Sequence, residues 1–172
     1  MSRRAFVAAV ALGLAGCASL GPAQPPPDLA GRLAIRVDAS AKTPSKSFSA
    51  DFDLRGNADR GTLRLTGPLG ATLAEVRWQP GRAELADGQG TRAFDTLDAM
   101  AQELFGEPMP LVALIDWLRG RPWPGAPNSK RDDGFEQLGW HIGLGSFAEG
   151  LLQATRDSAP AVSVRARLDK PA

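Results

Sequence analysis

Residues 61–78 read GTLRLTGPLGATLAEVRW, and the pattern in this stretch decides the fold. Leu63 and Leu65 alternate with polar residues before Gly67-Pro68-Leu69-Gly70, and apolar residues hold every second position again from Ala74 to Trp78. A period of two turns one set of side chains toward a core and the other toward water. Proline and glycines in a short separator are typical of a tight turn. The stretch therefore predicts a hairpin of two half-buried antiparallel strands.

The same alternation recurs along most of the chain. Leu33, Ile35 and Val37 alternate with charged residues, and Phe48 to Leu54 alternate with Ser and Asp in the same way. Short separators rich in Gly connect these segments, so consecutive strands should be antiparallel neighbours. Further strands are predicted at residues 31–37, 48–54, 83–86, 91–94, 135–142, 150–155 and 161–168.

Two helices interrupt the strands. Apolar residues from Leu97 to Phe105 recur at helical spacing, after Asp95 or Thr96 as a cap and before Gly106 as a stop. A second apolar helix is predicted from Pro110 to Gly120. The next segment, residues 120–134, contains three Pro and a Trp and balanced charges, and it is predicted to be a long surface loop.

Composition limits the number of domains and the class of function. The chain has 172 residues, 43% hydrophobic and 23% charged, with 20 basic and 19 acidic side chains, which is typical of one globular domain near neutrality. A single Cys excludes an intramolecular disulfide, and a single His excludes a multi-histidine metal site. No phosphate-binding loop motif occurs, and Gly143-x-Gly145-x-x-Ala148 lies too near the C-terminus for a dinucleotide fold. We therefore predict neither a cofactor nor a metal, and no enzymatic activity.

The N-terminal residues resemble a bacterial lipoprotein signal. Arg3 and Arg4 precede an uncharged apolar run that ends in Leu14-Ala15-Gly16-Cys17, which is similar to a lipobox. We expect residues 1–16 to be a signal peptide, residues 17–28 an acylated Cys17 with a Pro-rich tether, and residues 29–172 the folded domain. An ordinary secretory peptide with a chance Cys is the alternative.

Charge and lipid together predict the location. Cleavage before Cys17 leaves 18 basic and 19 acidic residues, a net charge of 18 − 19 = −1, so neither nucleic acid nor a membrane surface attracts the chain electrostatically. Attachment must then come from acyl chains. By resemblance to lipoprotein sorting signals, the absence of Asp after Cys17 points to the outer membrane, with the domain in the periplasm.

The order of several motifs resembles the outer-membrane lipoprotein receptor family LolB. These motifs are Cys17, Gly31-Arg32-Leu33, Gly67-Pro68-Leu69-Gly70, and Pro110-Leu111 followed by Trp117-Leu118-Arg119-Gly120-x-Pro122. The resemblance implies a mainly β, α+β fold, an incompletely closed antiparallel β-barrel with a short helical lid over a hydrophobic cavity. It also implies a receptor that takes acylated lipoprotein cargo from a LolA-like periplasmic carrier and places it among outer-membrane lipids. We expect a monomer.

The resemblance also assigns roles to residues. Cys17 matches the lipid anchor, and Leu69, between Pro68 and Gly70, matches a protruding leucine that inserts into the membrane. An acyl-binding face is expected from inward residues of the sheet and the helices, although each of these is equally compatible with an ordinary core. They are Leu33, Ile35, Phe48, Phe52, Leu63, Leu65, Val76, Trp78, Leu97, Met100, Leu104, Leu111, Leu114, Ile115 and Leu118.

Two other functions remain open from the sequence. A tethered scaffold of the envelope would share every feature except a continuous apolar cavity. An envelope hydrolase is disfavoured, because His141 is the sole imidazole and no nucleophile elbow motif is present. From the residues alone, Leu69 could instead fold back onto its neighbours or be a single exposed leucine of no function.

Overall fold

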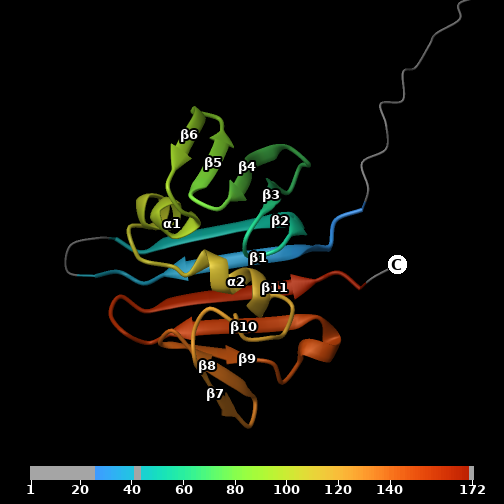
Figure 1. The fold of residues 1–172 in the computed structure, drawn as a ribbon, viewed down its shortest axis with the longest axis vertical. Coiled ribbons are helices and arrows are strands. Elements are labelled where there is room, and N and C mark those ends of the chain that lie inside the picture. Colours follow the sequence, from blue (N-terminus) through green and yellow to red (C-terminus); the bar gives the residue numbers. More distant parts are fainter. Residues whose placement is uncertain (1–25, 41–43, 171–172) are drawn as a thin grey trace, which may run out of the picture.

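A computed structural model describes residues 26–40 and 44–170. These residues form one antiparallel sheet of eleven strands, with two helices against it (Figure 1). The strands are β1 (Leu29–Val37), β2 (Lys46–Gly56), β3 (Gly61–Thr66), β4 (Thr72–Gln79), β5 (Arg82–Asp87), β6 (Gly90–Phe94), β7 (Asn128–Arg131), β8 (Gly134–Gln137), β9 (Trp140–Gly143), β10 (Leu151–Arg156) and β11 (Val162–Leu168). The helices are α1 (Leu97–Phe105) and α2 (Leu111–Trp117), and a short 3-10 turn (Phe147–Glu149) precedes β10.

The sheet is not closed into a full barrel. Its strand order is β6-β5-β4-β3-β2-β1-β11-β10-β9-β8-β7, so β1 and β11 join an N-terminal half to a C-terminal half. Among the described residues, β6 and β7 are edge strands that do not pair with each other. The predicted fold class is confirmed: a mainly β chain folds into an incompletely closed antiparallel barrel with two helices as its lid (Figure 1).

α1 begins and ends at the predicted signals, and α2 begins as predicted but ends at Trp117, three residues before the predicted stop at Gly120. The Thr96 side chain accepts a hydrogen bond from the Ala99 backbone N–H at 3.0 Å, which satisfies one free donor of the first turn of α1. Gly106 ends α1 in the left-handed conformation, φ 76°, where a side chain would be strained. α2 starts directly after Pro110. Helical periodicity and caps were therefore sufficient to place the lid.

The strand predicted at residues 135–142 is wrong, because the structure has two strands there. β8 and β9 form a hairpin whose turn is Leu138-Gly139, with φ angles of 53° and 75°. A bulky residue at positive φ is rare, so Leu-Gly gives a weak turn signal. The inward residues change phase across this turn, from Phe135 and Gln137 to Trp140 and Ile142. That change of phase was the available sign of a hairpin.

The predicted loop at residues 120–134 is only partly correct. Its second half contains β7, whose four residues are all exposed and so show no alternation. Its first half is held by the buried side chain of Gln137, which accepts from Trp117 Nε1 at 2.8 Å and from the Trp123 backbone N–H at 2.9 Å. The Gln137 amide also donates to the carbonyls of Trp123 and Ala126, at 2.7 and 2.8 Å. This segment is therefore tied to the sheet.

The two halves of the fold are filled differently. In the C-terminal half, Trp117 of α2 packs on Trp140 of β9 with ring centroids 5.9 Å apart, and their neighbours are closely packed. Phe135, Ile142, Leu152, Val162 and Val164 complete this buried cluster. Large aromatic side chains fill the space between helix and sheet there. In the N-terminal half, the side chains of sheet and helices do not fill the space between them, and a cavity remains.

Candidate functional site: a cavity beneath two helices

The cavity lies between strands β1 to β5 and the two helices, and its volume is about 650 Å³. Natural cores contain few voids larger than a water molecule. Pockets that hold small molecules typically measure about 300–1,000 Å³ and are lined mainly by apolar side chains. The size of this space therefore indicates a binding site rather than a packing defect.

All fifteen residues predicted to face the acyl chains line this one cavity. The sheet contributes eight of them, the helices six, and Leu118 directly follows α2, so the structure brings together residues up to 85 positions apart, from Leu33 to Leu118. Their placement follows from the period of two on β1 to β4 and from the apolar faces of α1 and α2. These fifteen lining residues are Leu33, Ile35, Phe48, Phe52, Leu63, Leu65, Val76, Trp78, Leu97, Met100, Leu104, Leu111, Leu114, Ile115 and Leu118.

The cavity has a closed end and a mouth. Leu54, Val76 and Trp78 line it and are buried, and Trp78 Nε1 donates to the Asn57 carbonyl at 2.9 Å. Lys46 and Leu73 also line it but are exposed to solvent, so the cavity opens to water beside them. Lys46 and Leu54 are eight positions apart on β2, which at about 3.3 Å per residue separates mouth and closed end by roughly 26 Å.

Nine further residues line the cavity, and the sequence patterns did not predict them. Five are apolar, and Leu54, Ala74 and Leu85 were identifiable because they continue the inward phase of their strands. Lys46 and Asp87 occupy the same inward phase on β2 and β5, where an ionisable residue is unexpected. The full set is Ser45, Lys46, Ser47, Leu54, Leu73, Ala74, Leu85, Asp87 and Phe105.

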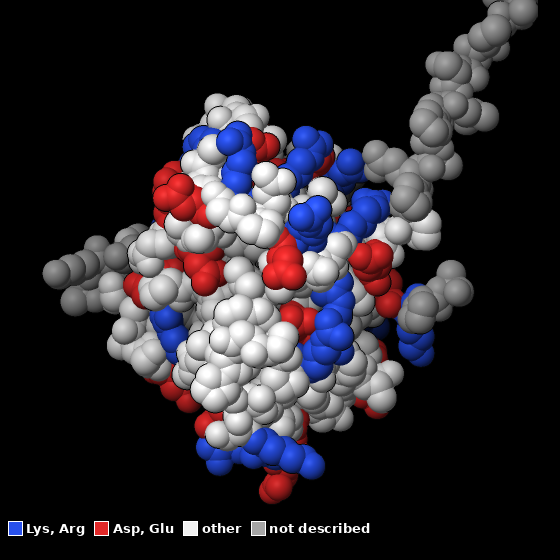
Figure 2. All heavy atoms as spheres, viewed as in Figure 1, with Lys and Arg blue, Asp and Glu red and all other residues white. Residues whose placement is uncertain are grey.

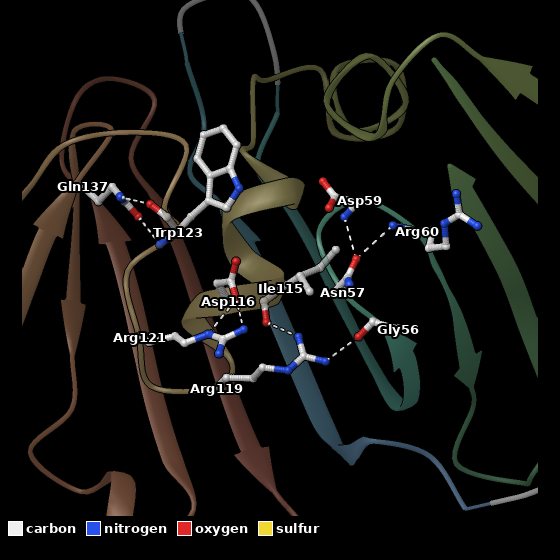
Figure 3. Close-up of polar contacts among 10 residues, drawn as sticks. All are labelled: Gly56, Asn57, Asp59, Arg60, Ile115, Asp116, Arg119, Arg121, Trp123 and Gln137. Carbon is white, nitrogen blue, oxygen red and sulfur yellow. Dashed lines mark hydrogen bonds and ion pairs between the residues drawn. The ribbon is translucent and has the colours of Figure 1, made fainter. Parts of the chain in front are cut away.

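Polar contacts fix α2 at its C-terminal end (Figure 3). Arg119 donates to the carbonyl of Ile115 within the helix at 2.9 Å and to the carbonyl of Gly56, at the end of β2, at 2.6 Å. Arg121 pairs with the buried carboxylate of Asp116 at 2.7 Å. Charge-assisted hydrogen bonds of this kind are stronger than neutral ones. α2 is therefore attached to the sheet at the closed end of the cavity.

The connection between the two helices is held by the C-terminal half. Arg156 on β10 donates to the carbonyl of Pro108 at 2.9 Å and pairs with Glu107 at 3.3 Å. Its guanidinium also lies 5.7 Å from the centroid of the Trp140 ring. The segment before α2 is thereby fixed to the packed half of the fold.

α1 packs on the core through the buried Leu97, Met100 and Ala101, and ion pairs link its outer side to the sheet. Arg92 on β6 lies 2.8 Å from the Asp87 carboxylate and 3.0 Å from that of Glu103 on α1. The pKa of Asp87 is lowered, first by the backbone N–H of Gln89 and then by Arg92. The pair of Arg92 with Glu103 lies near the surface and contributes little to stability, so α1 is held mainly by its buried apolar face.

Asp98 links α1 to the first turn of α2. Its carboxylate accepts a hydrogen bond from the Val112 backbone N–H at 3.5 Å. Partial desolvation between the helices raises the pKa of Asp98, and the hydrogen bonds from Val112 and Leu111 oppose that shift. The contact between the two lid helices therefore includes a titratable group.

Leu69 lies at the tip of the β3–β4 turn. The side chain is 98% exposed, so it does not fold back onto its neighbours. Hydrogen bonds from Gly70 N–H to the Gly67 carbonyl and from Gly67 N–H to the Ala71 carbonyl, both 2.9 Å, close the turn beneath it. Leu73, which lines the mouth of the cavity, follows within the next strand. An exposed leucine therefore stands close in the chain to the cavity mouth.

The surface charge is mixed rather than concentrated. Figure 2 shows Lys, Arg, Asp and Glu interspersed around the rim of the face viewed, with an uncharged area where Figure 1 places α2 and the segment after it. His141 lies on β9, 3.1 Å from Asp133, and does not line the cavity. Within the described ranges, no group of three or more His, Cys, Asp or Glu side chains has the arrangement of a metal site.

Comparison with known proteins identifies the family that has this architecture. Residues 28–161 match the family model described as "Outer membrane lipoprotein LolB". This chain belongs to the LolB family. It is 36% identical to the outer-membrane lipoprotein LolB of Chromobacterium violaceum over 154 residues, covering 83% of this chain and 82% of the relative. It is 36% identical to LolB of Bordetella petrii over 175 residues, covering 92% and 87%.

Membership in the LolB family confirms several predictions. The family resemblance read from the motifs is correct, and the outer-membrane location agrees with the names of the relatives. LolB proteins are transport receptors rather than enzymes, which confirms the prediction that this chain is not an enzyme. In the part of the chain that the structure describes, no helix is long and apolar enough to span a membrane. Cys17, the expected anchor, lies outside the described residues.

Proposed function

We propose that this protein is an outer-membrane receptor that accepts acylated lipoproteins in the cavity beneath α1 and α2 and inserts them into the outer membrane. The observation that carries the proposal is the apolar cavity of about 650 Å³. A protein that only scaffolds the envelope needs no such space. Family membership supports the same function.

The energetics explain why such a receptor needs a cavity. Exposing acyl chains to water costs about 0.8 kcal/mol for each methylene group, which amounts to tens of kcal/mol for several chains. A lipoprotein that crosses an aqueous compartment therefore needs an apolar shelter at every step. The wall residues Leu33, Phe52 and Leu114 supply the aliphatic and aromatic surface that such chains prefer.

Transfer requires only that each successive site holds the chains more tightly. The cavity must bind them better than the carrier does and less well than the bilayer. The affinity of the cavity depends on its apolar area and on how readily α1 opens, because opening exposes the apolar face of α1 and breaks the surface ion pair of Arg92 with Glu103. No external energy source is needed in this scheme.

Three segments of the chain have separate roles. Residues 1–16 direct export, residues 17–28 tether the domain through an acylated Cys17, and residues 29–172 bind cargo. Confinement at the membrane raises the local concentration of receptor there and makes delivery directional. Leu69, with Pro68 and Gly70, inserts into the bilayer and lowers the barrier for the chains to leave. The donor of cargo is a LolA-like periplasmic carrier, and the receptor acts as a monomer.

The test is a direct transfer assay. Every described strand and helix lies beyond residue 28, so a soluble form that starts at Ala18 keeps the whole described domain. Purified carrier loaded with radiolabelled lipoprotein is mixed with this form, and the label is followed by affinity separation. Movement of most of the label to the receptor supports the proposal. Retention of the label on the carrier, with a correctly folded receptor, would favour the scaffold instead.

A further inference from the structure

One charged side chain occupies a position that the strand pattern assigns to the apolar face. On β2 the inward residues are Phe48, Ala50, Phe52 and Leu54, and Lys46 continues that phase opposite the buried Val37 of β1. Lys46 lines the cavity and is exposed, so it stands at the mouth. A lysine stem packs along apolar surface while its ammonium group stays near water. Lys46 therefore forms a cationic rim to an otherwise apolar wall.

The ammonium group of Lys46 has donor capacity that the fold does not use. Its hydrogen bond to the Leu104 carbonyl, at the end of α1, is 3.5 Å long, which is at the limit of a hydrogen bond. In residues 26–40 and 44–170, no carboxylate lies within ion-pair distance of it. Asp87, the acidic residue at the mouth, is already engaged by Arg92 and by the Gln89 backbone N–H at 2.9 Å.

We propose that Lys46 binds the carbonyl oxygens at the head of the acyl chains while the chains lie in the cavity. This inference rests on the proposed function and adds a polar subsite to it. Ser45 and Ser47, which flank Lys46 and also line the mouth, supply further hydroxyl donors beside it.

The chemistry of the cargo fits a rim of donors. Every acyl chain ends at an ester or amide carbonyl, which can only accept a hydrogen bond, and an acceptor buried without a donor is costly. A chain inserted toward Trp78 and Leu54 leaves its carbonyl near the mouth, where Lys46 donates to it. The apolar wall gives affinity without direction, whereas the rim fixes which end of the chain faces out.

Two ligands separate this role from general apolar binding. One is a synthetic N-acetylated cysteine peptide that carries a diacylglyceryl group on sulfur, and the other is its counterpart with two ether-linked alkyl chains of the same length. The second ligand lacks the ester carbonyls but fills the same volume. Affinities are measured by fluorescence titration of the soluble form that starts at Ala18, with the variants Lys46→Met and Lys130→Met.

The expected result is a selective loss. Lys46→Met weakens binding of the diacyl peptide by about three- to tenfold, the effect of one net hydrogen bond, and leaves the ether-linked peptide unchanged within twofold. Lys130→Met, at an exposed position of β7 remote from the cavity, binds both ligands as the parent does. Circular dichroism confirms that each variant is folded.

Each other outcome has a separate meaning. If Lys46→Met binds both peptides like the parent, or loses both equally, the carbonyl subsite is wrong while the receptor function stands. If it weakens only a free fatty acid, added as a third ligand, then Lys46 attracts a carboxylate and the proposal is also overturned. If the parent protein binds neither peptide, the proposed function itself fails.

Discussion

Arg119 donates a hydrogen bond to the backbone carbonyl of Gly56 at 2.6 Å, across 63 positions of sequence. This contact joins the end of α2 to the end of β2 (Figure 3), two residues after the buried Leu54 that lines the closed end of the cavity. The Gly56 N–H in turn donates to the Asp28 carboxylate at 2.7 Å, where the described chain enters β1. The closed end of the cavity is therefore also the point where the domain receives its N-terminal segment.

Arg119→Met should lower the free energy of unfolding by about 1–3 kcal/mol, because two backbone carbonyls lose a charged donor in a partly buried place. The measurement is urea unfolding at neutral pH. Arg165→Met on the outward face of β11 is the matched control and should change stability by less than about 0.5 kcal/mol. Equal effects of the two variants would contradict the attachment of α2 through Arg119.

Leu69→Glu should leave acceptance of cargo unchanged and slow its release into liposomes by at least about tenfold, since a carboxylate enters the bilayer far less readily than a leucine. Release is followed as incorporation of labelled lipoprotein into vesicles. Leu138→Glu is a suitable control, because Leu138 is also exposed at a hairpin turn, though at the β8–β9 turn of the other half. Normal delivery by Leu69→Glu would exclude the membrane-insertion role.

Ala74→Phe should fill part of the cavity and reduce binding of an acyl ligand by about fivefold or more, with little change in stability, because Ala74 faces empty space. Ala154→Phe places the same substitution in the packed half of the fold, where the opposite result is expected. Ala154 is fully buried in the packed half, so the larger side chain should destabilise the fold by about 1–3 kcal/mol. Thermal unfolding and ligand titration distinguish the two. Equal destabilisation by both would mean that the N-terminal half is not hollow.

Asp98→Asn should become more stabilising as the pH rises. The folded-state pKa of Asp98 is raised above the unfolded value of 3.8 by desolvation, so the stability that protonated Asp98 contributes is present below 3.8 and is lost as pH rises through the folded pKa. The Asn side chain stays neutral and keeps an acceptor for Val112. The measurement is unfolding free energy at pH 3 to 7 relative to the parent. A difference that does not vary with pH would contradict the shift.

Asp87→Asn should behave in the opposite way. The folded-state pKa of Asp87 is lowered, so its carboxylate stabilises the fold above the unfolded value of 3.8, and that contribution is lost as pH falls through the folded pKa. The variant should therefore be less stable than the parent at neutral pH and equal to it in acid. The same unfolding series checks this, and a variant as stable as the parent at pH 7 would contradict it.

A strand could be predicted from the sequence where one of its faces is buried and the other is exposed. β1 to β4 alternate clearly because one face meets the helices, and this alternation was sufficient to place the eight predicted wall residues of the sheet, while helical spacing placed the other seven. β7 is exposed on every residue, so it carries no such contrast and was taken for a loop. Lys46 was missed for a different reason: the strand was predicted to begin at Phe48, whereas β2 begins two residues earlier, at Lys46.

Both helices, most of the strands, the turn at Leu69 and the family were determined by the sequence, because periodicity, caps and turn residues act over a few neighbouring positions. Only the tertiary structure decided that one half of the fold is packed around Trp117 and Trp140 while the other half encloses a cavity. The physical reason is volume. Whether two short helices fill the space above a curved sheet depends on the total volume of side chains that come from distant parts of the chain. A pattern within one segment does not contain that total volume.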